Sequence, residues 1–209
     1  MIYLTNNQKI YIAALVVGVV LLLIGTCFFT FKRIYLKKRY HEDVYLKLSK
    51  TSELNDYLLL NNYRVEFDDR YYGVIDHLLI SKKYIYVIND FDISGVVSGD
   101  LKDLFLRVVT SKDKAINVSN PLNYNINLIK RLNVYHRLDQ SLIKGIVVIN
   151  NDSTINVTGS NNQFLIIKRN ELLKYIKKFD KDDIGNLKEK DVVNFINKLD
   201  KENQRKNNG

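Results

Sequence analysis

The sequence is poor in the residues that build cross-linked or metal-bound scaffolds. It has one cysteine, three histidines, one proline and no tryptophan in 209 residues. Cys27 therefore has no partner for an intrachain disulfide, and no cysteine and histidine stand at zinc-ligand spacing. These absences exclude a disulfide-rich module and a zinc module.

The common catalytic and nucleotide-binding signatures are also missing. The chain contains no P-loop, no GxGxxG fingerprint, no GxSxG nucleophile elbow and no HExxH motif. The familiar nucleotide-binding and hydrolase classes that depend on these motifs are therefore excluded.

A long uncharged stretch is present near the N-terminus. Residues 10–31 form a run of 22 residues without a charge, and at about 1.5 Å per residue such a helix reaches the roughly 30 Å of a bilayer core. A cleaved signal peptide is the first alternative, but only Lys9 precedes the run and no A-x-A site follows it. A lipoprotein is the second alternative. It would use Cys27, but the residue before it is Thr26 and not the small Gly or Ala that a lipoprotein signal has there. The pattern favours a transmembrane helix.

The charge distribution predicts how this helix is oriented. The formal net charge is +9, which favours anionic partners, and a basic cluster directly follows the apolar run: Lys32, Arg33, Lys37, Lys38 and Arg39. By the positive-inside rule, we expect a single-pass protein of the cell (inner) membrane with its C-terminal domain in the cytoplasm. The expected parts are an extracytoplasmic N-terminus at 1–9, the span at 10–31, a basic stalk at 32–50, one domain at 51–200 and a disordered tail at 201–209.

The domain reads as α/β. A hairpin is the clearest element, because two strands rich in β-branched residues are joined by Ser81-Lys82-Lys83. Asn120 and Pro121 predict the N-cap and first turn of a helix. The expected helices are 42–60, 120–138, 170–179 and 188–199, and the expected strands are 63–67, 74–80, 84–88, 104–109, 144–149 and 163–167.

Four short pieces of the domain together resemble one family. The segment Gly73-Val74-Ile75-Asp76-His77 is similar to a Q-I-D-H strand. Residues 84–88 are similar to the G-x-x-V-I strand that follows it. Gly95 is similar to the glycine of a K-N-x-x-G element, and Asn120-Pro121-Leu122 with Asn125 to an N-P-x-x-Q-N helix start. In this order and spacing they resemble the NERD (nuclease-related) domain of bacterial membrane-associated and cytosolic proteins. The resemblance covers residues 50–150 and implies a restriction-endonuclease-like mixed sheet flanked by helices, of the PD-(D/E)XK superfamily.

The resemblance also implies where a nuclease centre would lie. Asp76 takes the place of the first metal-binding acid, Asn89 that of the second acid, and Phe91 that of the catalytic lysine. Tyr124 stands at the helix glutamine, and Glu53 is the candidate for the N-terminal acid. Mg²⁺ is the cofactor that an active member would need, and no other cofactor is expected.

These replacements weaken the case for catalysis. A neutral Asn89 offers no charge to Mg²⁺, and losing the lysine removes transition-state stabilisation commonly worth about 2.7 to 4 kcal/mol. Asp90 is the alternative second metal ligand, although strand alternation turns it away from Asn89, and it turns His77 away from Asp76 in the same way. Amines for rescue would come from Lys82, Lys83 or Lys130.

Three functions stay open at this point. The first is a catalytically degenerate NERD-like module that binds nucleic acid or a protein partner at the membrane. The second is an active metal-dependent DNA or RNA phosphodiesterase with a migrated site, and the third is a structural membrane adaptor. A lysine stripe is a further candidate phosphate contact, although a solvated helix face is the ordinary interpretation: Lys174, Lys177, Lys178 and Lys181.

Overall fold

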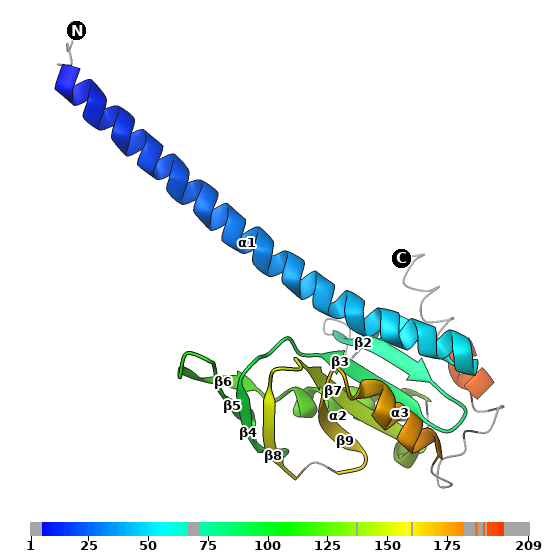
Figure 1. Ribbon diagram of the computed structural model, residues 1–209. Helices are drawn as coiled ribbons and strands as arrows, with labels where there is room; N and C mark the ends of the chain where they lie inside the picture. The colour runs from blue at the N-terminus through cyan, green and yellow to red at the C-terminus, as the bar shows by residue number, and fades with distance from the viewer. Residues whose placement is uncertain are drawn as a thin grey trace. The chain divides into compact units, whose positions relative to one another are not determined.

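A computed structural model describes residues 6–66, 72–136, 138–159, 161–181, 187, 190 and 192–198. The chain divides into two compact units, Met1–Glu42 and Asp43–Gly209. Helix α1 (Asn6–Asn55) begins in the first unit and supplies the first residues of the second (Figure 1).

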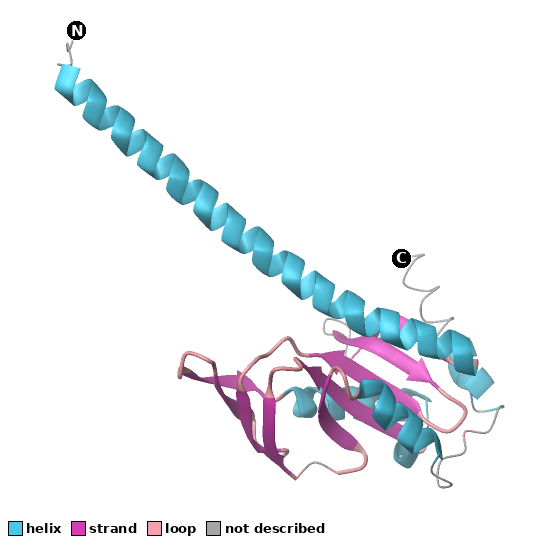
Figure 2. Ribbon diagram, in the orientation of Figure 1, coloured by secondary structure: helices cyan, strands magenta, loops and turns pink. Residues whose placement is uncertain are grey.

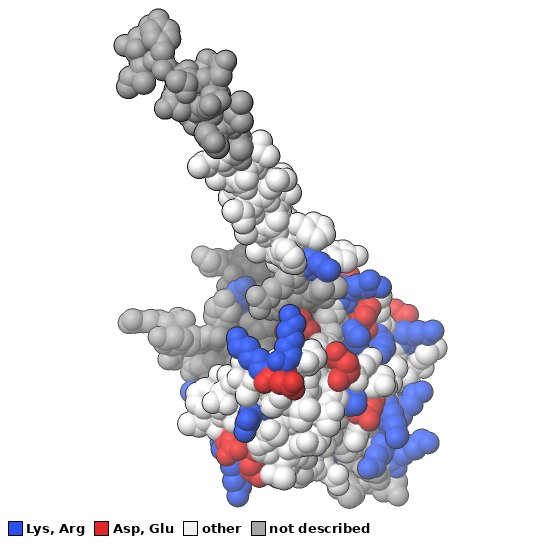
Figure 3. All heavy atoms as spheres, turned by 60° about the vertical axis from the view of Figure 1, so that its left-hand side comes forward, with Lys and Arg blue, Asp and Glu red and all other residues white. Residues whose placement is uncertain are grey.

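The first unit contains one helix that is long and apolar enough to cross a membrane. Its span, Leu15–Lys32, has a mean hydropathy of 2.3 and no buried side chains. In Figure 3 the described part of the helix that precedes its first basic residue is white, which means that it carries no charged side chain. The hydroxyls of Thr26 and Thr30 donate to carbonyls of their own helix, Leu23 O at 2.9 Å and Thr26 O at 2.8 Å. Such internal bonding is what a polar side chain needs in hydrocarbon.

The basic cluster follows on the same helix. Lys32 and Arg39 are exposed, whereas the side chains of Arg33, Lys37 and Lys38 lie outside the described residues. The expected tail at 201–209 also lies outside them.

The second unit is built on a five-stranded mixed sheet with the order β1-β2-β3-β7-β9 (Figure 2). Strands β1, β2 and β3 follow one another in the chain and pair antiparallel. Strand β7 pairs parallel with β3, and β9 pairs parallel with β7. The bounds are β1 (Leu58–Glu66), β2 (Tyr72–Ile80), β3 (Ile85–Asp90), β7 (Ile143–Ile149) and β9 (Phe164–Lys168).

A second sheet of four strands has the order β6-β5-β4-β8. Only its strand β5 is among the expected elements. All four strands are five residues long, but the other three are partly polar, and Val97 is the single buried residue among them. The bounds are β4 (Val96–Asp100), β5 (Phe105–Val109), β6 (Ala115–Ser119) and β8 (Thr154–Thr158).

Apolar side chains cover both faces of the five-stranded sheet. One cluster joins Val87 and Val147 to Leu128 of helix α2 (Pro121–His136) and to Leu106 of the second sheet. The other joins Ile88 and Ile146 to Val44 and Leu48 of α1 and to three residues of helix α3 (Leu172–Lys181): Leu172, Ile176 and Phe179. The predicted mixed α/β architecture with flanking helices is confirmed.

One helix ends well before its expected last residue. The helix expected at 42–60 ends at Asn55, because Asp56 adopts a left-handed φ of 59° and the Tyr57 N–H donates to Ser52 O at 3.0 Å. Residues 58–60 therefore belong to β1. Of the helix expected at 188–199, the structure describes residues 190 and 192–198, which are helical. A short 3-10 helix, η1 (Gln140–Leu142), precedes β7.

Asn120 confirms its predicted role at the start of α2. Its Oδ1 accepts the Leu122 N–H at 3.0 Å, while its Nδ2 donates to the carbonyls of Asp100, Leu101 and Asp103 at 3.3, 3.2 and 2.9 Å. The side chain is 3% exposed. One asparagine thus caps the helix and fixes it to the loop after β4.

Candidate functional site

The β2–β3 hairpin opens at the place where the nuclease centre was expected. The ladder runs from the pair Ile80–Ile85 to the pair His77–Ile88, and it stops there. Asp76 and Asn89 are the next residues on the two strands, so their side chains lie where backbone pairing ends.

Beyond this point, hydrogen bonds made by these two side chains replace the backbone hydrogen bonds of the ladder. The Asp76 carboxylate accepts the backbone N–H of Asp90 at 2.8 Å and the Asn89 amide at 3.4 Å. The same Asn89 Nδ2 donates to the Val74 carbonyl at 3.0 Å. Because a carboxylate at position 89 would repel Asp76 and could not donate to Val74, this arrangement is specific for asparagine.

The neighbouring strand β1 is distorted at the same level. Asn61 pairs with His77 and Tyr63 with Ile75, so Asn62 lies opposite Asp76. Its φ is 52°, a left-handed conformation that asparagine tolerates better than most side chains. Backbone of this kind is concentrated at functional sites in proteins.

Phe91 stands where the resemblance expects a lysine, and its side chain belongs to the apolar core. Its backbone N–H donates to Val148 O at 2.8 Å, which carries the β3–β7 pairing one residue beyond Asp90. The ring is half-buried and packs against the apolar cluster on the α2 side. This position therefore supplies a hydrophobic ring in place of an amine.

Helix α2 contributes a tyrosine and an asparagine. The Tyr124 hydroxyl accepts the Val74 N–H at 2.8 Å and donates to the Val74 carbonyl at 3.1 Å. Asn125 is fully buried, and its Nδ2 donates to Ile146 O at 3.1 Å and Val87 O at 3.4 Å. The Oδ1 atoms of Asn89 and Asn125 are buried without a hydrogen-bond partner in the part of the chain that the structure describes.

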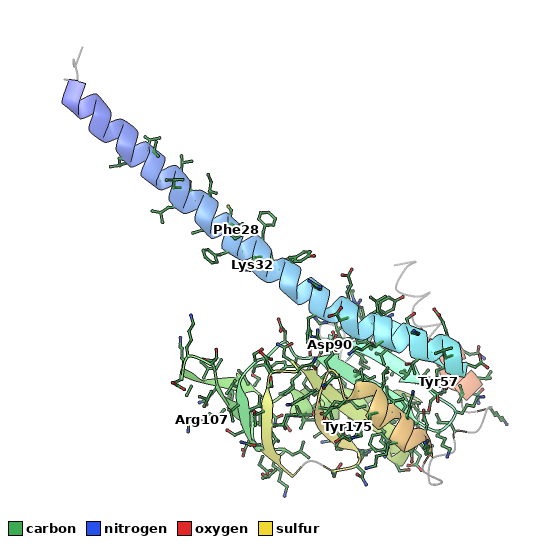
Figure 4. All side chains as sticks on the ribbon, viewed as in Figure 1. Phe28, Lys32, Tyr57, Asp90, Arg107 and Tyr175 are labelled. Atoms are coloured by element: carbon green, nitrogen blue, oxygen red, sulfur yellow. The ribbon has the colours of Figure 1, made fainter. Side chains whose placement is uncertain are left out.

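Asp90 turns to the opposite side of the sheet from Asn89, as strand alternation predicts. Its Oδ2 lies 3.0 Å from Nε2 of His77, and the two side chains are 0% and 6% exposed. The other ring nitrogen, Nδ1, lies 2.6 Å from Oδ1 of Asn61. Figure 4 marks Asp90 near the end of β3. The carboxylates of Asp76 and Asp90 therefore engage different partners and do not converge.

The remaining predicted contributors lie elsewhere. Glu53 is exposed on α1 and accepts a hydrogen bond from Ser49 at 3.4 Å. Lys82 and Lys83 occupy the β2–β3 turn, six or more residues from Asp76, which corresponds to about 20 Å along a strand. Lys130 is exposed on α2. Of the predicted site residues that the structure describes, Asp76, Asn89 and Tyr124 are linked to one another, through the Asn89 amide and the Val74 carbonyl.

This set of groups does not fit Mg²⁺. A single carboxylate is present, it already accepts a backbone N–H, and the adjacent Asn89 presents its amide N–H₂ toward it. Mg²⁺ requires near-octahedral oxygen ligands, and the described residues hold no group of three or more His, Cys, Asp or Glu side chains that could bind a metal.

A second polar cluster, which the sequence did not predict, lies under α3. Asp180 accepts hydrogen bonds from the hydroxyls of Tyr57 and Tyr86 at 2.7 Å each and from that of Ser81 at 2.9 Å. Burial, followed by the Asp180 carboxylate, raises the pKa values of Tyr57 and Tyr86 above their ordinary range. The only local signal was a tyrosine within the aliphatic first part of strand β3, Ile85 to Ile88.

Lys144 of β7 lies beside this cluster. It is 9% exposed, and its Nζ lies 4.5 Å from the centre of the Tyr84 ring and 4.9 Å from that of Phe179. Cation–π contact of this kind stabilises an ammonium group away from water.

Comparisons with known proteins gave one match. The family model described as the nuclease-related domain, NERD, matches residues 37–150, more than half of the chain. No curated protein and no solved structure matches.

Proposed function

Because the chain belongs to the nuclease-related domain (NERD) family, we propose that it is a membrane-anchored, catalytically degenerate member that binds nucleic acid at the inner face of the membrane. One observation carries the loss of catalysis: the Asp76 carboxylate is engaged by the Asp90 N–H and the Asn89 amide. In this proposal Asp76 is a structural remnant of a metal ligand.

The chemistry of the neighbouring positions supports the same conclusion. Hydrolysis of a phosphodiester needs a metal or other cation to stabilise the developing charge. Position 89 supplies an amide and position 91 a hydrophobic ring. The basic balance of the chain, +9, supports an anionic ligand.

Membrane anchoring rests on the first unit. Its helix is long and apolar enough to span a bilayer. Lys32 at the end of the apolar span and Arg39 after it are exposed. We propose that the basic side faces the cytoplasm. In a Cys27→Ser chain carrying Lys112→Cys in an exposed turn, an impermeant maleimide should label the domain only after the membrane is opened. Labelling of intact cells would reverse the proposed orientation.

The catalytic half of the proposal is tested with the full chain in detergent micelles. Single- and double-stranded DNA and RNA are incubated with Mg²⁺ or Mn²⁺, and we expect no cleavage above that of the Asp76→Ala protein. Metal-dependent cleavage that Asp76→Ala abolishes would make the protein an active nuclease and overturn the proposal.

The binding half is tested by titrating labelled oligonucleotides at several salt concentrations. Release of counterions from phosphates should make the affinity fall steeply as salt rises. If no salt-dependent binding occurs, the nucleic-acid role is lost.

A protein partner is the second candidate function. It is favoured by two adjacent apolar residues at β5 that face solvent, Leu104 and Phe105, which are 76% and 58% exposed. A crosslink to a partner in cells that Leu104→Ser with Phe105→Ser removes would support it. Retained crosslinking in that variant would exclude this surface as the contact.

A further inference from the structure

Helix α3 carries lysines on its outer side at helical spacing. Lys174, Lys177, Lys178 and Lys181 are all exposed, and positions i, i+3, i+4 and i+7 share one face of a helix. Leu172, Ile176 and Phe179 of the same helix are buried against the sheet. We call the four lysines together with Leu173 the lysine face.

The single acid of α3 does not neutralise this face. Asp180 is turned inward, where its carboxylate accepts the hydroxyls of Tyr57, Tyr86 and Ser81. Within the part of the chain that the structure describes, no ion pair involves any of the four lysines. The exposed charge of the helix is therefore of one sign.

The lysine face lines a hollow of about 530 Å³, and no other described residue lines it. In Figure 4, Tyr175 marks the position of α3 on the domain. A hollow with a cationic wall concentrates the field on an anion that enters it.

From these observations we propose that the lysine face binds the phosphate backbone of a nucleic acid, at a site separate from Asp76. Seven residues of α-helix advance about 10.5 Å, a length over which one strand of a duplex presents about three phosphates at 3.4 Å per step. Four lysines over two turns thus match about three phosphates, and the contact carries no sequence preference.

An anionic lipid surface is the competing ligand, and the composition of the helix disfavours it. Helices that lie in a membrane interface insert apolar side chains between their lysines. Here the apolar residues of α3 are committed to the domain, and Leu173 and Tyr175 pack against the same cluster. Leu173, the one apolar residue of the lysine face, therefore already packs against the domain and is not free to insert into lipid.

Charge at the helix end is the ordinary explanation for part of this pattern. Lys178 and Lys181 lie in the last turn, where cations offset the helix dipole. Lys174 and Lys177 lie outside that turn, so the dipole does not explain them.

The test uses the full chain in neutral phosphatidylcholine nanodiscs and labelled single- and double-stranded DNA. The variant replaces Lys174, Lys177, Lys178 and Lys181 with Gln. The control replaces four other exposed lysines with Gln and loses the same charge: Lys82, Lys102, Lys112 and Lys114.

We expect the α3 variant to bind at least about tenfold more weakly, and its plot of log affinity against log salt to lose about three from its slope, at 0.9 per phosphate. The control should keep the slope of the natural chain. Equal losses of DNA affinity in the two variants would show that the lysine face is not the binding site, although the chain would still bind nucleic acid. The inference rests on the proposed function, and failure of the natural chain to bind DNA would remove both.

Hydrogen exchange of residues 172–181 separates the lipid ligand from nucleic acid. On phosphatidylcholine nanodiscs, added DNA should protect this helix. Protection caused by phosphatidylserine without DNA, with DNA affinity unchanged in the α3 variant, would assign the face to the membrane and overturn the inference.

Discussion

The carboxylate of Asp76 on β2 accepts the backbone N–H of Asp90 on β3 at 2.8 Å, directly beyond the last ladder pair of the two strands. A side chain therefore continues the hairpin where the backbone stops pairing. This bond gives an acid of catalytic appearance a structural role, because a half-buried N–H that loses its acceptor is costly.

The first prediction concerns this bond. Asp76→Ala should lower the free energy of unfolding by about 1 to 3 kcal/mol, since it leaves the Asp90 N–H without its acceptor. Asp76→Asn retains an acceptor oxygen and should cost less. Urea unfolding followed by circular dichroism measures both. An Asp76→Ala protein as stable as the natural chain would contradict the structural role.

Asn89→Asp should make stability depend on pH. The new carboxylate would lie near Asp76 Oδ2, now 3.4 Å from Asn89 Nδ2, and repulsion between the two would raise the pKa of one of them. A folded-state pKa above the unfolded value means that stability is present at low pH and is lost as pH rises through the raised pKa. Melting temperature should therefore match the natural chain near pH 4 and fall below it at pH 7. A pH-independent difference would show that the carboxylates do not meet.

Phe91→Lys should destabilise the domain without creating activity. The ring packs against the apolar cluster on the α2 side, and replacing it with a charged chain should cost about 2 to 4 kcal/mol. Phe91→Leu, which keeps an apolar side chain, serves as the control and should cost about 1 to 2 kcal/mol. Chemical unfolding measures the loss. If Phe91→Lys unfolds like the natural chain, the position is solvated and open to an amine.

Asn120 offers a test of which of its bonds matters more. Asn120→Ala removes the cap and the donation to three carbonyls and should cost about 2 to 4 kcal/mol. Asn120→Asp keeps an acceptor for the Leu122 N–H but places a carboxylate against the Asp103 carbonyl, now 2.9 Å from Nδ2. Chemical unfolding should show it to be at least as destabilising as Ala. Asn117→Asp, on an exposed strand position, is the matched control. An Asn120→Asp protein of natural stability would show that the cap matters more than the three donated bonds.

The cluster under α3 predicts loss of stability in alkali. Burial and the Asp180 carboxylate raise the pKa of Tyr86 above its ordinary value of 10.0. The folded chain keeps this proton above pH 10 while the unfolded chain releases it, so unfolding releases a proton and stability falls as pH rises. The slope is about 1.4 kcal/mol per pH unit for one group. Tyr86→Phe should remove that part of the slope above pH 10, and Tyr45→Phe, on the exposed side of α1, should leave it unchanged.

Much of the fold could be predicted where the signal is local. The hairpin turn at Ser81 to Lys83 and the Asn120-Pro121 helix start depend on residues that are neighbours in sequence, and both are present. Strands β4, β6 and β8 were missed because their sequences are partly polar, and they form a sheet only by pairing with one another and with β5. Their stability comes from partners distant in sequence, which local patterns do not encode.

The candidate site divides in the same way. Alternation along β3 was sufficient to place Asn89 and Asp90 on opposite sides of the sheet. It did not predict that the two side chains would bond so differently, with Asn89 joined to Asp76 and Asp90 to His77. These hydrogen-bond partners depend on where the β2–β3 ladder ends. That point depends on how strands β1, β2 and β3 are placed beside one another.

Local sequence was enough to predict the apolar helix near the N-terminus, the basic residues that follow it, the α/β class and the replacements at positions 89 and 91. Each is a matter of composition or of spacing along a single element. Two further features depend on contacts between distant residues. The Asp76 carboxylate accepts a backbone N–H, and Asp180 faces inward to Tyr57, 123 positions away, and not toward the lysines of α3. Sequence alone does not predict these contacts, because the role of a charged side chain depends on the groups that folding brings within hydrogen-bonding distance.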